Sequence, residues 1–292
     1  MYELIPVGER TYYIDCPAKI GVVRGENDGV YLIDSGSDKD AAKKVRKILD
    51  QNGWTLLGIL NTHSHADHIG GNHYLQEQTG CKVFSGGMEA DFIRRPILEP
   101  SFLYGGFPPA ELRHKFLLAQ ESEVTDFSDP AFPKDIEIIP LPGHSFAMAG
   151  FRTPDDVVFL GDSVNSPATL KKYGVFFLHD VEAFLSTLDK AEQLSAALFI
   201  PSHAEPVTDC RELVRLNREK VREIGGCIVS LCAQPCTAED LLTRLFSAYD
   251  LTMTFQQHAL VGSTLRSYLT WLKNSGRVTA EIRENSLMWQ AL

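Results

Sequence analysis

Four short apolar segments of this chain are each followed at once by a histidine or an aspartate. The segments read LLGILNT, IIPLPG, VVFLG and LFIPS, and they precede His63, His144, Asp162 and His203. Short apolar runs bounded by Gly, Pro or Asn are typical of buried strands, and a rigid strand fixes the direction of the side chain that follows it. One such residue would be an ordinary polar turn residue, but four indicate a sheet-based fold whose strand ends share one site.

The first of these segments runs into the densest group of histidines in the chain, NTHSHADHIGG. This stretch contains His63, His65, Asp67 and His68. Neutral imidazoles and a carboxylate suit a borderline divalent cation such as zinc. The alternative is a set of solvated polar residues at a strand end. The two glycines that close the stretch let the next helix pack close to the sheet.

The N-terminal part of the chain alternates strands with helices. A helix is expected after DSGS because apolar residues recur there at helical spacing, with Ser37 or Asp38 as N-cap and Gly53 beyond the end. Gly80 is expected to end a second helix. The expected strands cover residues 11–15, 19–25, 29–36 and 82–86, and the expected helices cover residues 38–52 and 68–79.

Residues 86–134 are the least regular part of the chain and are rich in Pro, Gly and aromatic residues. They are too apolar for a solvated linker, so we interpret them as an insertion packed on the body, in the manner of a lid. Regularity returns with the three strand–turn units that end in His144, Asp162 and His203. An amphipathic helix over residues 181–195 is expected between the last two units.

From about residue 211 the pattern changes to helices. Three helices are expected, over residues 210–232, 237–249 and 263–276, and Thr237 with Asp240 forms a capping box. Two short strand-like pieces finish the chain. The pattern predicts a winged-helix-like module over residues 211–292 behind a catalytic domain over residues 1–210.

Charge and composition exclude several classes of protein. The net charge of −10 argues against binding of nucleic acid or anionic membranes by the whole surface. Residues 211–292 hold ten Lys and Arg against eight Asp and Glu, a net +2, which leaves −12 for residues 1–210. There is neither a basic segment followed by an apolar run at the start nor an apolar stretch of membrane-spanning length, so we expect a cytoplasmic protein without membrane association.

Six scattered cysteines then indicate reduced thiols. Cys232 and Cys236, with Cys227 nearby, have a spacing that a metal clip also uses. The simpler interpretation, which we favour, is a set of buried thiols around a helix end.

The motifs THSHADHIGG, PGHS, LGDS and PSHAEP, with LIDSG before them, resemble the successive motifs of the metallo-β-lactamase-fold hydrolases. The resemblance covers roughly residues 1–210 in order and spacing. It implies an α/β (α+β) chain folded as an αββα sandwich, with two mixed sheets face to face and helices on both outer faces. The C-terminal segment resembles the winged-helix segment that some bacterial hydrolases and a related endoribonuclease branch carry.

The resemblance also implies a dinuclear metal site. One ion is expected at His63, His65 and His144, the other at Asp67, His68 and His203, with Asp162 bridging the two. The cofactors are then two divalent metal ions, zinc first, with iron or manganese as alternatives.

Two such cations sharing one water would generate a hydroxide near neutral pH and stabilise the developing oxyanion. Asp67 is a ligand that would also orient the nucleophile or move its proton to the leaving group. Asp34 either supports the ligands from behind or caps the DSGS turn.

The expected function is therefore hydrolysis of a small-molecule ester, thioester or lactone. Glyoxalase II-like thioesterases share all seven ligands, whereas GDSVNSPATL lacks the tyrosine that acyl-homoserine lactonases place there, and His65 argues against the di-iron redox members. An iron-dependent persulfide dioxygenase and a non-catalytic metal-binding regulator rank lower.

The main alternative is a nucleic-acid phosphodiesterase that uses the C-terminal module. Its candidate recognition helix offers only Arg266, Lys273 and Arg277 as cations, which is weakly basic for a groove-binding element. A module that packs on the catalytic domain, shapes its mouth or forms a homodimer is favoured.

Several further residues are candidates for contact with a substrate. Phe102, Tyr104 and Phe107 would form an apolar wall over the metals, although packing of a long insertion explains them as well. Lys171, Lys172 and Tyr173 would anchor an anion or lie in a solvated loop, and His179 would reach the site from a helix start. His73, His114 and His258 are interpreted as structural.

Overall fold

The alternation of apolar residues in the first strands sends successive side chains to opposite faces of one sheet. In β4 (Gly29–Ile33), Val30 and Leu32 pack with the helices on the outer face, whereas Ile33 packs toward a second sheet. In β5 (Thr55–Leu60), Ile59 and Leu60 divide in the same way. Each strand is thus buried on both faces, which requires one layer on either side.

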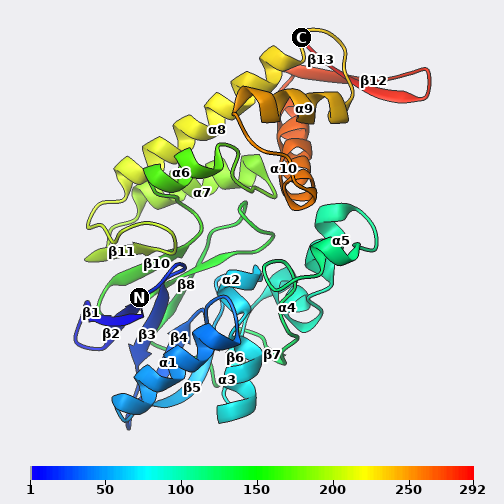
Figure 1. Ribbon diagram of the computed structural model, residues 1–292. Coiled ribbons are helices and arrows are strands. Elements are labelled where there is room, and N and C mark those ends of the chain that lie inside the picture. Colours follow the sequence, from blue (N-terminus) through cyan, green and yellow to red (C-terminus); the bar gives the residue numbers. More distant parts are fainter. Residues whose placement is uncertain (1) are drawn as a thin grey trace.

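The structure, a computed structural model that describes residues 2–292, supplies these layers as two sheets face to face (Figure 1). The first sheet has seven strands in sequence order, antiparallel through β4 and parallel from β4 to β7. Its strands are β1 (Glu3–Pro6), β2 (Thr11–Asp15), β3 (Ile20–Arg24), β4, β5, β6 (Lys82–Phe84) and β7 (Val124–Thr125).

The second sheet has the order β11-β10-β9-β8, with only β10 and β11 parallel. Its strands are β8 (Glu137–Pro140), β9 (Ala149–Arg152), β10 (Val157–Gly161) and β11 (Leu198–Pro201). Phe84, Phe151 and Phe159 lie in the core between the two sheets. The expected αββα sandwich is confirmed.

Helices cover both outer faces. On the first sheet lie α1 (Lys39–Gln51) and α3 (Asn72–Thr79), and on the second lie α7 (Val181–Gln193) and α8 (Arg211–Leu231). Asp38 caps α1 as expected, since its carboxylate accepts hydrogen bonds from the backbone of Asp40 and Ala41. The remaining helices of the body are α2 (Ala66–Ile69), α4 (Gly87–Arg94), α5 (Leu98–Tyr104), a 3₁₀ turn at Ala110–Leu112 and α6 (Pro167–Tyr173).

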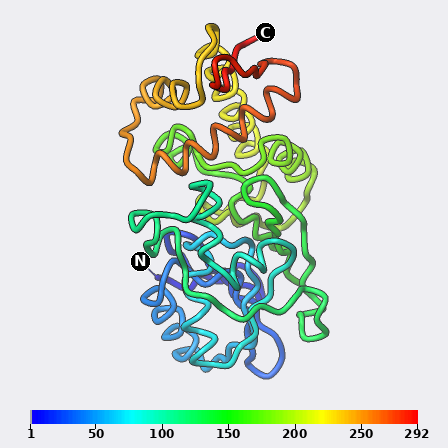
Figure 2. The backbone as a smooth tube through the Cα atoms, turned by 90° about the vertical axis from the view of Figure 1, so that its right-hand side faces the viewer, coloured from blue at the N-terminus to red at the C-terminus, as the bar shows by residue number. Residues whose placement is uncertain are grey.

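The C-terminal residues add α9 (Ala238–Ala248), α10 (Phe255–Asn274) and the hairpin β12 (Val278–Arg283) with β13 (Ser286–Ala291). In both views they lie at one end of the molecule, beyond the second sheet (Figure 1, Figure 2). Their apolar residues share one continuous core with that sheet and α7. The expected three helices and hairpin are present, and Thr237 with Asp240 forms the expected capping box.

Two expectations about local structure were wrong. The helix expected over residues 68–79 is two helices, α2 and α3, separated by Gly70 and Gly71, where an added Cβ would overlap the backbone of Ser37 and Ser35. Residues 167–173 form helix α6 instead of a loop, with Pro167 in its first turn and Ser166 as N-cap. Residues 86–134, expected to be the least regular part of the chain, contain α4, α5, the 3₁₀ turn and the edge strand β7 with irregular chain between them.

The C-terminal helix α10 begins at Phe255, earlier than the expected residue 263, because the Thr254 hydroxyl caps it. The six cysteines carry free thiols, and Cys232 and Cys236 are buried in the core shared with the second sheet. Among residues 2–292, no helix combines the length and apolar character needed to cross a bilayer.

Gly143 fixes the turn that carries His144. Its φ of +119° suits glycine, and an added Cβ would overlap the backbone of Phe184 at the start of α7. Its carbonyl also accepts hydrogen bonds from the backbone N–H groups of His179 and Asp180. The His144 turn is therefore clamped against α7 at backbone level.

We expect Gly143→Ala to lower the free energy of unfolding by about 1–3 kcal/mol, measured by denaturant titration. Gly226→Ala is the matched control. Gly226 lies inside α8 with no atom within 4 Å of an added Cβ, so the same change should stabilise that helix by up to about 1 kcal/mol. A Gly143→Ala protein as stable as the wild type would contradict the proposed clamp.

Candidate metal centre

The strand ends of both sheets converge on one point between the sheets. His63 and His65 follow β5, and Asp67 and His68 lie in the short helix α2 directly after them. The second sheet contributes the remaining residues from the turns after its strands. These are His144 after β8, Asp162 after β10 and His203 after β11.

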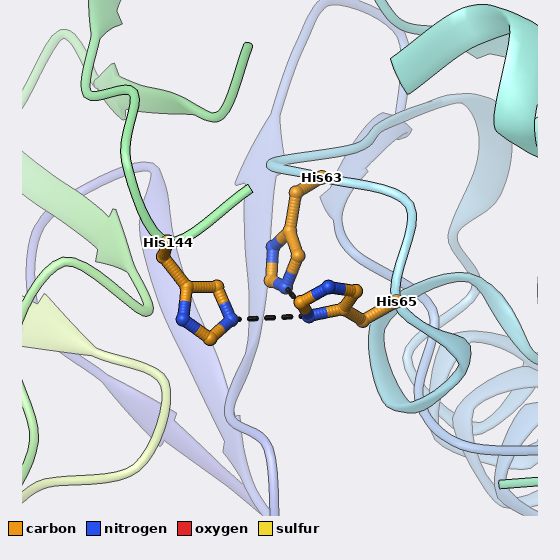
Figure 3. Close-up of side chains that lie close together, drawn as sticks. All are labelled: His63, His65 and His144. Atoms are coloured by element: carbon orange, nitrogen blue, oxygen red, sulfur yellow. Dashed lines mark hydrogen bonds between the residues drawn. The ribbon is translucent and has the colours of Figure 1, made fainter. Parts of the chain in front are cut away.

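The first group of residues consists of His63, His65 and His144, and one ring nitrogen of each meets the others. Nδ1 of His65 lies 3.0 Å from Nε2 of His63 and 3.0 Å from Nε2 of His144 (Figure 3). Since a neutral imidazole has one N–H, three nitrogens that face one another do not satisfy each other fully by hydrogen bonding. Convergence of this kind on one point is typical of ligands around a cation.

The second group combines His68 and His203 with two carboxylates. His203 Nε2 lies 3.2 Å from an Asp67 oxygen and 3.4 Å from an Asp162 oxygen. His68 Nε2 lies 3.6 Å from Asp67 and 3.4 Å from Asp162. One Asp162 oxygen also lies 3.4 Å from His144 Nε2. Asp162 therefore faces both groups, and the seven residues expected from the sequence are all brought together.

Asp34 supports the second group from behind. One of its carboxylate oxygens lies 2.8 Å from His68 Nδ1 and accepts a hydrogen bond from the Thr62 hydroxyl, while the other accepts from the Thr62 backbone N–H. This arrangement keeps a proton on Nδ1 of His68 and leaves Nε2 as the lone-pair donor. Of the two roles left open for Asp34, the contacts favour support of the histidine. On the other side, His203 Nδ1 lies 2.9 Å from the Pro17 carbonyl.

The protonation of the two groups differs. Burial lowers the pKa of His65 to about 4, that of His144 to about 3 and that of His63 well below its ordinary value, so the first group is neutral. The Asp162 carboxylate raises the pKa of His203 to about 10. Burial alone would lower the pKa of His68, but the Asp67 and Asp162 carboxylates raise it well above its ordinary value.

In the second group, protons on histidines thus balance the carboxylates. A divalent cation supplies the same positive charge and displaces those protons. Two buried atoms there, Nε2 of His68 and Oδ1 of Asp162, have no hydrogen-bond partner. Burial of a polar atom without a hydrogen-bond partner costs free energy unless an ion or ligand binds the atom. The donor set and these two atoms fit metal ions, and three subsets of the seven residues place their ligand atoms within 4.8 Å of one another.

Glu89 of helix α4 joins the two histidine loops, and the sequence analysis missed it. One carboxylate oxygen accepts hydrogen bonds from the Ser64 backbone and hydroxyl, at 2.9 and 2.6 Å. The other accepts from the Ser145 hydroxyl and the Ala147 backbone, both at 2.8 Å. Since Ser64 and Ser145 adjoin His63, His65 and His144, this buried carboxylate sets the spacing of the first group.

Glu99 of helix α5 is the second residue that the sequence analysis missed. Its carboxyl lies 3.6 Å from Nε2 of His65, whereas the other histidines face Nδ1 of that ring. Burial, followed by the nearby Glu89 charge, raises the pKa of Glu99 to about 8. No motif or periodicity marks either glutamate, because both lie in the irregular segment 86–134.

Five of the seven residues, His65, Asp67, His144, Asp162 and His203, line a pocket of about 1050 Å³. Its other walls come from the turn between β2 and β3, the segment 115–117, α6 with the segment 175–177 after it, and the C-terminal helix α10. They include Lys19, Lys115, Phe116, Leu117, Lys172, Tyr173, Phe177, Leu260, Val261 and Thr264. Of the proposed substrate residues, Lys172 and Tyr173 line this pocket, whereas Lys171 does not.

The other expected substrate residues lie elsewhere. Phe102, Tyr104 and His179 line a second pocket between α5 and α10. The ring centroids of His179 and Phe146 are 3.8 Å apart, and Phe102 packs on both rings. Phe107 is 75% exposed and lies under Arg113. The expected aromatic wall was therefore wrong: Phe102 and Tyr104 line the second pocket, Phe107 lines neither, and Phe116 and Phe177 line the first pocket instead.

Three histidines interpreted as structural lie outside both pockets. His73 contacts the Glu121 carbonyl, His114 packs on Phe116, and His258 pairs with Glu239. In the same region of the chain, Arg266 also pairs with Glu239, and Arg277 lies over the Trp271 ring.

Comparisons with known proteins agree with this architecture. The model of the Metallo-beta-lactamase superfamily matches residues 13–203. A hydroxyacylglutathione hydrolase of Methylococcus capsulatus is 31% identical over 147 residues, and one of Brucella ovis is 28% identical over 150 residues. These matches cover 48% and 49% of this chain and the same shares of the relatives. The chain thus spans about half the length of the curated relatives it matches.

Two solved structures align over nearly the whole chain. A beta-lactamase domain protein from Burkholderia ambifaria has a TM-score of 0.75 at 17% identity and covers 99% of this chain and 94% of its own. A metallo-beta-lactamase family protein from Thermus thermophilus has a TM-score of 0.71 at 20% identity and covers 100% and 98%. At these identities the likeness concerns the fold, including the C-terminal unit.

Glu89→Ala should weaken zinc binding by about 10- to 100-fold, because the Ser64 and Ser145 loops lose the carboxylate that holds them in register. The affinity is measured by competition with a chromogenic chelator. Asp91→Ala is the matched control, since Asp91 is an exposed carboxylate on the same helix. Unchanged zinc affinity in a folded Glu89→Ala protein would show that the first group does not depend on this contact.

Proposed function

We propose that this chain, which belongs to the metallo-beta-lactamase superfamily, is a hydrolase that works with two divalent metal ions, zinc first, on a small-molecule thioester or ester. The observation that carries this proposal is the convergence of seven imidazoles and carboxylates with two unpartnered ligand atoms at its centre. We assign His63, His65 and His144 to one ion. We assign Asp67, His68 and His203 to the other, with Asp162 between them.

Two ions bound there would lower the pKa of a water molecule and polarise the substrate carbonyl. The residues of this chain position that chemistry. Asp34 fixes the tautomer of His68, and Glu89 fixes the spacing of the two histidine loops. Asp67 is the most exposed of the seven, with 45% of its side chain accessible, so it is the ligand placed to exchange a proton with a leaving group.

The preference for a thioester or ester rests on two observations. The hydroxyacylglutathione hydrolases that match this chain are named for a thioester substrate, although the match spans about half of their length. The pocket is also concave and partly apolar, as small-molecule sites are. A lactone would present the same carbonyl centre.

A nucleic-acid substrate is the alternative kept from the sequence. Helix α10, whose second half is the candidate recognition helix, contributes Leu260, Val261 and Thr264 to the pocket wall. Of the three cations in the candidate recognition segment, Arg266 lies 3.8 Å from Glu239 and Arg277 lies over the Trp271 ring, so both have partners within the protein. We therefore propose that the unit of residues 211–292 completes a small-molecule pocket.

The test is hydrolysis by zinc-loaded protein of a panel that contains a hydroxyacyl-glutathione thioester, a simple alkyl thioester, an aryl ester, a lactone and an aryl phosphodiester. Turnover of a thioester or ester is expected. Asp162→Asn should lower kcat at least about 100-fold, because loss of a residue that only supports a ligand already costs up to about that much. It should also lower the bound zinc below two ions per chain, measured by elemental analysis.

Asp50→Asn is the control, because Asp50 lies on the exposed side of α1 and pairs only with Arg46 among the described residues. It should leave kcat and zinc content unchanged. Turnover of the phosphodiester alone would favour the nucleic-acid alternative, and full activity of metal-free protein would refute the metal-dependent mechanism.

A further inference from the structure

One side of the pocket is an apolar strip that begins beside His65 and His144. The ring of Phe177 lies with its centroid 5.3 Å from that of His65 and 5.8 Å from that of His144, edge to face in both cases. Phe177 in turn belongs to one apolar cluster with Leu117 and Leu260. All three side chains line the pocket. An apolar part of a ligand that extends away from His63, His65 and His144 therefore meets a continuous apolar surface.

Helix α10 forms the far wall of this strip. Leu260, Val261 and Thr264 line the pocket at the spacing of one helical face. The helix is fixed in place, since Val261 is buried in the core shared with the second sheet, and Ala259 packs with Leu103 and Leu112. The wall is therefore held by buried contacts of Val261 and Ala259, and Leu260 lines the pocket between them.

Leu260 is the residue of this wall whose side chain is partly exposed to the pocket. Val261 and Thr264 are almost fully buried by their own neighbours, whereas Leu260 is only partly buried. Its methyl groups are thus available to a ligand. The exposed Phe116, 65% accessible, lies next to Leu117 and extends the apolar lining toward solvent.

We infer that this strip binds the unbranched acyl chain of the substrate, and that Leu260 of the C-terminal unit determines the chain length that is accepted. The inference rests on the proposed function for the identity of the ligand as an acyl group. The reacting carbonyl lies at the ligand residues, the first carbons pass Phe177, and the chain end meets Leu260. Each methylene then removes apolar surface from water until the wall is reached.

The test measures binding of straight-chain carboxylates, from butyrate to decanoate, to zinc-loaded protein by isothermal titration calorimetry. A carboxylate is the product of acyl hydrolysis, so it reports on the acyl pocket without any turnover. In the wild type, affinity should rise about fourfold per methylene and then level off. In Leu260→Trp the levelling should come about two carbons earlier, because an indole ring fills more of the strip than an isobutyl group.

Leu260→Ala should move the levelling to longer chains, which keeps the inference testable if the tryptophan variant folds poorly. Thr270→Trp is the matched control, since Thr270 is exposed on the same helix and lines the second pocket. It should reproduce the wild-type series. Affinities that do not rise with chain length, or a levelling point that is the same in all four proteins, would overturn the inference.

Failure of the proposed function gives a different result. Wild-type protein that hydrolyses no ester or thioester, yet shows the rising and Leu260-dependent carboxylate series, would refute the hydrolase proposal and support the acyl-binding strip. Hydrolysis of thioesters at rates independent of acyl length, together with carboxylate affinities that do not change with chain length, would support the hydrolase proposal and refute the acyl-binding strip.

Discussion

The structure depends on a concentration of imidazoles and carboxylates that their own hydrogen bonds do not satisfy. Removal of such groups from water is costly unless each is paired or bound to a cation. Here the first group is neutral because burial depresses its pKa values, and the second keeps positive charge on His68 and His203 to match Asp67 and Asp162. The two divalent ions that we propose would resolve both problems at once, which would explain why so many contacts from the surrounding structure hold these side chains in place.

That supporting structure comes from both sheets and from the segment between them. Asp34 at the end of β4 holds His68, and Pro17 of the N-terminal hairpin holds His203. Glu89 of α4 bonds to a loop from each sheet. The segment 86–134 therefore contributes a buried carboxylate that joins the two loops, and its strand β7 extends the first sheet.

The convergence of the seven imidazoles and carboxylates could be predicted from the sequence because each lies in a turn or short helix directly after an apolar strand. Asp34 was recognised in the same way. Glu89 and Glu99 could not be predicted, since they lie on short helices and their role follows from which loops those helices happen to meet. The direction of Phe102 and Tyr104 was wrong for the same reason: the turn of α5 toward α10 is a tertiary property.

The start of α10 was placed too late because Gln256, Gln257 and His258 form a polar run after Phe255, and Gly262, a poor helix former, follows within the helix. That error concealed the helix face, with Leu260 and Val261, that closes the pocket. The C-terminal unit shares its core with the second sheet and with α7, so it belongs to the same cooperative structure as the site. Residues far from the ligands in sequence thus complete the space in which the substrate is expected to bind.

The most direct measurement is anomalous diffraction at the zinc edge from crystals of zinc-loaded protein. The account predicts two peaks, one bounded by His63, His65 and His144 and the other by Asp67, His68 and His203, with Asp162 in contact with both. Zinc bound elsewhere, or these side chains turned away from one another in the presence of excess zinc, would contradict it.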